Sequence, residues 1–175
     1  LHYPLRRQRQ MCIRDSPSSD LADSTSFYVQ IAATAFDDPS GNSYAGISDT
    51  TSLSFTTADE TNPSLSSSSP ADNATAVATT SNIVLNFSEA VDVETGNIVI
   101  YKASDDSVVE TIDVTSSQVT GTGSTQITIN PSSDLADSTS FYVQIAATAF
   151  DDPSGNSYAG ISDTTSLSFT TADET

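Results

Sequence analysis

Acidic side chains dominate the residues that could do chemistry in this chain. The 175 residues include 23 Asp and Glu against 5 Lys and Arg, a formal net charge of −18 at pH 7. The only histidine, His2, and the only cysteine, Cys12, lie within the first sixteen residues. Neither a Ser-His-Asp triad nor a cysteine-rich zinc site can therefore be assembled from the rest. Adjacent acids such as Asp151 and Asp152 are more often turn formers than glycosidase carboxylates, so we expect no enzymatic activity.

The negative charge also limits the partners and ligands of the chain. Nucleic acids and anionic membranes are bound through Lys and Arg, which are scarce here. No apolar run approaches the ~20 residues that span a bilayer. We therefore expect neither nucleic-acid binding nor membrane insertion. Carboxylate and amide oxygens are, however, the ligands that calcium prefers, and Ca²⁺ is the metal that this composition favours.

Residues 1–16 differ in composition from the rest of the chain. The segment LHYPLRRQRQMCIRDS holds four of the five basic residues, and no apolar run follows the arginines as it would in a signal peptide. A basic nucleic-acid-binding arm is the alternative. The string RQRQMCIRDS resembles translated sequencing-adaptor sequence, and we expect this leader to be foreign to the natural protein. The remaining residues carry 22 acids and a single base, Lys102.

A repeat of 45 residues organises the remaining sequence. Residues 17–61 recur without a single difference as residues 131–175, at an offset of 114 residues. This period is the size of a β-sandwich domain, which indicates a tandem array of whole domains. We expect residues 62–175 to form one complete repeat and residues 17–61 to be the C-terminal part of an incomplete one. The chain then resembles a fragment of a longer array.

Short segments of alternating apolar residues predict the strands of the complete repeat. Turn-forming stretches rich in Asp, Asn, Gly and Ser separate them. The expected strands are residues 82–87, 97–101, 108–114, 118–120, 125–130, 140–145 and 167–171. About seven short strands in roughly 110 residues predict an all-β, immunoglobulin-like β-sandwich. The incomplete repeat holds only two of these strands, so one apolar face should lack cover, and we expect loose order or cover borrowed from elsewhere in the chain.

Four segments of the complete repeat carry a family resemblance. They are NPSLSSSSPADNATAVATTSNIVLNFSEAV, SSDLADSTSFYVQI, FDDPSGNSYAG and SLSFTTADET. Together, residues 62–171 resemble bacterial immunoglobulin-like domains of the S-layer (SbsA-like) type. The resemblance implies a structural or adhesive repeat of a large secreted or cell-surface protein, such as an adhesin. Its implied partners are neighbouring repeats and cell-surface or matrix ligands. A carbohydrate-binding or accessory module of a secreted enzyme is the alternative, but the sequence has no Trp to build an aromatic strip.

The topology of such a sandwich would gather acids at one end of the complete repeat. The loops after residues 82–87 and 140–145 share this end, and the preceding linker reaches it because the first strand of such a sandwich, before residue 82, runs antiparallel to residues 82–87. The candidate calcium ligands are Asp59, Glu60, Glu89, Asp92, Asp151, Asp152 and Asn156. A bound ion there would stiffen the junction between repeats. Equally, Asp-Pro-Ser-Gly-Asn is a good turn sequence and surface acids favour solubility, so both interpretations remain open.

Overall fold

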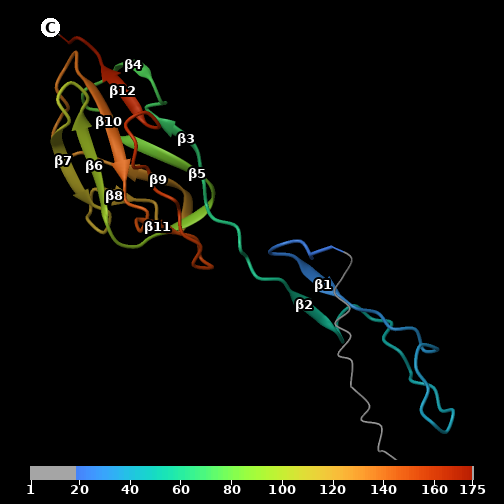
Figure 1. Ribbon diagram of the computed structural model, residues 1–175. Helices are drawn as coiled ribbons and strands as arrows, with labels where there is room; N and C mark the ends of the chain where they lie inside the picture. The colour runs from blue at the N-terminus through green and yellow to red at the C-terminus, as the bar shows by residue number, and fades with distance from the viewer. Residues whose placement is uncertain (1–18, 175) are drawn as a thin grey trace, which may run out of the picture. The chain divides into compact units, whose positions relative to one another are not determined.

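The computed structural model describes residues 19–174, which form strands and turns (Figure 1). The predicted foreign leader, residues 1–16, lies outside the described residues. Contacts divide the chain into two units, the first ending at Ala58 and the second beginning at Asp59. We call residues 19–58 the half-repeat and residues 59–174 the complete repeat. None of the described residues belongs to a helix long and apolar enough to cross a membrane.

Two five-stranded sheets form the complete repeat. The first contains, in spatial order, β4 (Ala74–Val77), β12 (Ser168–Thr171), β10 (Ser140–Ile145), β6 (Asn97–Lys102) and β7 (Ser107–Asp113). The second contains β11 (Phe150–Asp151), β5 (Ile83–Val93), β9 (Ser124–Ile129) and β8 (Val119–Thr120), and β3 (Leu65–Ser69) also pairs with β5. This arrangement confirms the predicted all-β, immunoglobulin-like sandwich.

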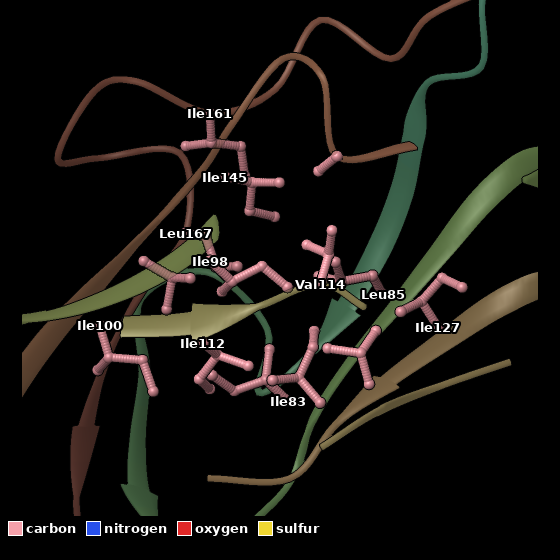
Figure 2. Close-up of a cluster of buried hydrophobic side chains, with 14 of the residues drawn as sticks. Ile83, Leu85, Ile98, Ile100, Ile112, Val114, Ile127, Ile145, Ile161 and Leu167 are labelled. Atoms are coloured by element: carbon pink, nitrogen blue, oxygen red, sulfur yellow. The ribbon is translucent and has the colours of Figure 1, made fainter. Parts of the chain in front are cut away.

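The apolar side of each strand builds the core between the two sheets. Ile83 and Leu85 of β5 and Ile127 and Ile129 of β9 are each 0% exposed, as their alternation predicts. Leu85 lies opposite Ile127 in the strand register. Figure 2 shows Ile83, Leu85 and Ile127 in one cluster with residues from the opposite sheet, such as Ile98, and Ile129 belongs to the same cluster. Full burial of an aliphatic side chain contributes about 1.5–3 kcal/mol, so this cluster is the main source of stability.

The strands of the complete repeat differ from the predicted set in two ways. β5 does not end at Phe87 but continues to Val93, with an irregular register between Asn86 and Val91. β3 and β4 were not predicted as strands, because their sequences, LSSSS and ATAV, have little apolar alternation. Pairing with neighbouring strands forms them instead, which is common where β-propensity is weak.

The first and last strands of the complete repeat run in the same direction. β3, whose bounds the sequence did not predict, pairs antiparallel with β5 as expected of the first strand, and residues 70–73 then carry the chain across to the other sheet. There β4 pairs parallel with β12, with Ala74 opposite Phe169. The chain therefore reaches the sandwich at one end and leaves it at the other (Figure 1).

The half-repeat keeps the strand pairing of its identical counterpart. Its strands β1 (Ser26–Tyr28) and β2 (Ser54–Thr56) are antiparallel, with Ser26 opposite Thr56. The same register joins Ser140 to Thr170 in the complete repeat. The half-repeat exposes its apolar side as predicted: Phe55 is 43% exposed.

Candidate metal centre

Three carboxylates meet where the linker reaches the complete repeat. One oxygen atom from each of Asp59, Glu89 and Asp152 lies within 4.8 Å of the other two. Calcium binds oxygen at about 2.4 Å, so one ion can contact atoms up to twice that distance apart. Like charges this close repel by roughly 1–3 kcal/mol per pair at effective dielectric constants of 20–80, and a cation would reverse that repulsion. The three oxygens therefore fit a hard divalent cation.

Three different segments supply these carboxylates. Asp59 belongs to the linker, Glu89 to the irregular part of β5, and Asp152 to the turn that follows β11. The linker is held beside β5 because Ser88 N–H donates to the carbonyl of Ser64 at 2.8 Å and Ser64 N–H donates to the Ser88 hydroxyl at 3.0 Å. Tertiary structure therefore brings the group together.

Asp152 is the most buried member of the group, with 3% of its surface exposed. Its Oδ1 accepts hydrogen bonds from the backbone N–H groups of Ser154 and Asn156, both at 2.8 Å. Its Oδ2 accepts one from Asn156 Nδ2 at 2.8 Å. Burial raises the pKa of Asp152. The hydrogen bonds, above all the one from the Asn156 side chain, together lower the pKa by more than burial raises it, so the net pKa lies below its ordinary value. The buried group is therefore a charged carboxylate at neutral pH.

Asn156 connects the loop to the linker. Its Nδ2 also donates to the backbone carbonyl of Asp59 at 3.1 Å, across 97 residues of sequence. The side chain thus helps to position Asp59 beside Asp152. Sequence reasoning had named Asn156 only as a direct ligand; in the structure its amide nitrogen instead fixes the geometry of two acidic residues.

The half-repeat contains the same loop without the other acids. Asp38 accepts hydrogen bonds from Ser40 N–H at 2.9 Å and from the N–H and Nδ2 groups of Asn42 at 2.8 Å each. These distances match those at Asp152 to within 0.1 Å, although Asp38 is exposed. The local sequence is therefore sufficient to form the turn, which is what the turn interpretation of these residues proposes. That interpretation does not explain why Asp59 and Glu89, which lie far away in the sequence, come close to Asp152.

The remaining predicted ligands lie outside the group of three. Asp92 and Asp151 face each other as a cross-strand pair of β5 and β11. The Asp92 carboxylate accepts a hydrogen bond from Thr122 Oγ1 at 3.2 Å. The sequence predicts Asp92 in the loop after residues 82–87, but β5 continues through Asp92 and pairs it with Asp151 of β11. Glu60 is an exposed residue of the linker.

A second linker contact lies at the opposite end of the complete repeat, and sequence reasoning missed it. Thr79 Oγ1 donates to Glu174 Oε2 at 2.9 Å, and Thr79 N–H makes a longer contact of 3.4 Å to Oε1. Asp173 and Glu174 are the repeat equivalents of Asp59 and Glu60. The recurrence of TADET at the end of both copies was the available signal. One linker sequence is thus seen at both ends of a repeat.

Comparisons relate this chain to a known family and to a solved structure. A family model described as a bacterial Ig-like domain matches residues 59–171, the part that contains the three carboxylates. Among solved structures, the S-layer protein rSbsC(31-844) is similar, with a TM-score of 0.44 and 15% sequence identity. The alignment covers 66% of this chain and 14% of the S-layer chain, so the present chain spans a small part of that protein's length. A search of curated proteins gave no match.

Proposed function

The chain belongs to the bacterial Ig-like domain family, and on that premise we propose that it is a non-catalytic structural repeat of a large secreted or cell-surface bacterial protein. The observation that carries this proposal is the position of the two ends. The linker meets β3 at one end of the sandwich and β12 leaves at the other. Because the repeat recurs with its linker, successive copies can be joined end to end as an extended array. Neighbouring repeats are then its first partners.

The linker supports this role through contacts to both of its neighbours. Its aspartate, seen as Asp59, lies beside Glu89 and Asp152 of the repeat that follows. Its glutamate, seen as Glu174, accepts the hydrogen bond from Thr79 of the repeat that precedes. Adjacent linker residues are thus attached to successive domains, and calcium bound by the three carboxylates restricts the bending of the junction. An array built this way holds an adhesive or surface-layer segment at a distance from its anchor.

Thermal melting of the full chain in EDTA and in millimolar calcium tests the metal part of the proposal. Binding at 100 times the Kd stabilises a folded protein by about 2.7 kcal/mol, which predicts a Tm rise of roughly 10 °C. Asp152→Asn should remove most of this calcium-dependent rise. The matched control is Asp38→Asn, the same change in the same loop of the half-repeat, which lacks the other carboxylates and should leave the rise intact.

Two results would separate the parts of the proposal. A Tm that does not respond to calcium would leave a spacer whose acids serve turns and solubility. An equal loss of the response in both variants would show that the ion binds elsewhere. The end-to-end arrangement is tested separately by small-angle scattering of several joined repeats, where a compact particle would contradict it.

A further inference from the structure

Two adjacent linker residues make hydrogen bonds to two different repeats. In the half-repeat, the carbonyl of Ala58 accepts a hydrogen bond from Ser24 N–H at 3.1 Å. In the complete repeat, the carbonyl of the next residue, Asp59, accepts one from Asn156 Nδ2 at 3.1 Å. The boundary between two repeats therefore falls at a single peptide bond, and no linker residue separates the two contacts.

The end of the complete repeat shows the first of these contacts again and adds a further one. The carbonyl of Ala172, the equivalent of Ala58, accepts a hydrogen bond from Ser138 N–H at 2.8 Å. Two residues later, Glu174 accepts the hydrogen bond from Thr79 Oγ1 at 2.9 Å. A preceding repeat thus binds the alanine and the glutamate of the linker sequence Ala-Asp-Glu, whereas the following repeat binds the aspartate between them.

The three contacts alternate between the two repeats within a very short length of chain. Consecutive Cα atoms lie about 3.8 Å apart, so the Cα atoms of the alanine and the glutamate are separated by at most about 7.6 Å. When all three contacts form together, the end of one repeat and the start of the next face each other with room for little more than the linker. Neither repeat can then turn about the linker without breaking a hydrogen bond.

The residues that bind the linker are themselves fixed to their repeat. Thr79 is 7% exposed, and its carbonyl accepts a hydrogen bond from Leu135 N–H at 2.9 Å. The N–H and Nδ2 groups of Asn156 both donate to the carboxylate of Asp152, which is 3% exposed. Each contact therefore joins the linker to the body of a repeat and not to a loosely attached loop.

Polar groups form both of the surfaces that would meet. At the end of the complete repeat, Thr79 borders a polar notch of about 30 Å³, whose lining also includes Ser81, Asn130 and Asp134. At its start, the turn formed by residues 153–155, next to Asn156, is exposed. Hydrogen bonds and not apolar burial would hold such an interface together, so the loss of one hydrogen bond should have a measurable effect.

We propose that successive repeats of the array form a direct interface, with no hinge residue between them and without any metal. The surface around Thr79 of one repeat and the surface around Asn156 of the next are joined through the Asp-Glu pair of a single linker. The partner of each surface is therefore another copy of the same repeat. This inference rests on the proposed end-to-end array but not on calcium, because every contact that carries it is a hydrogen bond between protein groups.

Distance distributions between spin labels on two complete repeats test the interface. The protein is the full chain extended after Thr175 by a second copy of residues 62–175, with Cys12→Ser. Val108→Cys in both complete repeats provides the labels, since Val108 is 56% exposed. In EDTA and about 0.15 M NaCl, which screens distant charges, we expect a distribution as narrow as that of a pair within one repeat, Ser66→Cys and Val108→Cys. Free rotation between domains would broaden it about two-fold or more.

Each contact has a matched control in the same molecule. Thr79→Val in the first complete repeat removes the hydroxyl that binds the glutamate of this junction, and Asn156→Ala in the second removes the contact to its aspartate. Together they should broaden the distribution about two-fold, and each alone by part of that. The same substitutions in the opposite copies, Thr79→Val in the second repeat and Asn156→Ala in the first, lie away from this junction and should leave the width unchanged.

Four results would overturn the proposed interface. They are a broad distribution in the unchanged protein, no broadening by the junction variants, equal broadening by the control variants, and a distribution that narrows only in millimolar calcium. The last of these would still support the metal-stiffened junction. A mean distance well below roughly 35 Å, the length of the eleven residues of β5, would contradict the end-to-end array and the interface with it.

Discussion

Replacing Phe169 with alanine should destabilise the complete repeat far more than the same change at its identical counterpart, Phe55. Phe169 is 2% exposed, and its ring lies 5.8 Å from that of Phe141. A buried Phe removes about 150 Å² or more from water, worth about 4 kcal/mol at ~25 cal/mol per Å². Measured Phe→Ala truncations in cores cost about 3–5 kcal/mol. Since small domains are stable by only about 5–15 kcal/mol, this loss is a large fraction of the total.

Urea denaturation followed by circular dichroism measures the effect on each variant. Phe55 is 43% exposed and belongs to the other unit, so Phe55→Ala should change the unfolding free energy of the complete repeat by less than about 0.5 kcal/mol. Phe169→Ala should lower its Tm by roughly 10 °C or more. The two changes occur in identical local sequence, so intrinsic propensity cancels in the comparison. Similar losses in both variants would refute the argument that cover by residues 62–130 determines the stability.

Two further predictions concern a pair of glycines and the acid dependence of stability. Gly121→Ala should destabilise the protein by several kcal/mol, because the new Cβ would lie 2.1 Å from the Gln126 carbonyl oxygen. Gly155→Ala has a similar positive φ but nothing within 4 Å of the new Cβ, so it should cost only about 1–2 kcal/mol. Equal losses of unfolding free energy in urea denaturation would contradict this. Burial raises the pKa of Asp152, but the hydrogen bonds from Asn156, Ser154 and Gly155 together outweigh it and leave the pKa below the ordinary value of 3.8. The charge of Asp152 therefore stabilises the fold above pH 3.8, and this contribution is lost as the pH falls through the folded-state pKa. Urea titrations between about pH 2 and 6 should therefore show a weaker acid dependence in Asp152→Asn than in the unchanged chain.

The sequence was sufficient to predict the fold class because apolar alternation determines which strand faces are buried. Ile83 and Leu85, and Phe141 with Val143, are all buried as their spacing predicts. The serine-rich β3 was missed because no periodic apolar signal marks it, and pairing with β5 stabilises it instead. The length of β5 was underestimated for a related reason, since a polar stretch around Glu89 interrupts the alternation.

The candidate site could be predicted only in part. The topology of the sandwich placed Asp59, Glu89 and Asp152 at one end, and these three are close together in the structure. The separation of Asp92 and Asp151 from them follows from strand pairing, which spacing alone does not specify. The hydrogen bond from Thr79 to Glu174 joins residues 95 positions apart, and no local pattern predicts such a contact.

The parallel pairing of β4 with β12 has a mechanical consequence. A pulling force applied to the two ends of the complete repeat reaches the start of β4 through β3 and residues 70–73, and it acts directly on the end of β12. Because the strands are parallel neighbours, this force slides them along each other and loads their hydrogen bonds together, whereas an antiparallel pair pulled from one edge opens one bond at a time. An array of such domains is therefore suited to carry tension along its length without unravelling at the first weak bond.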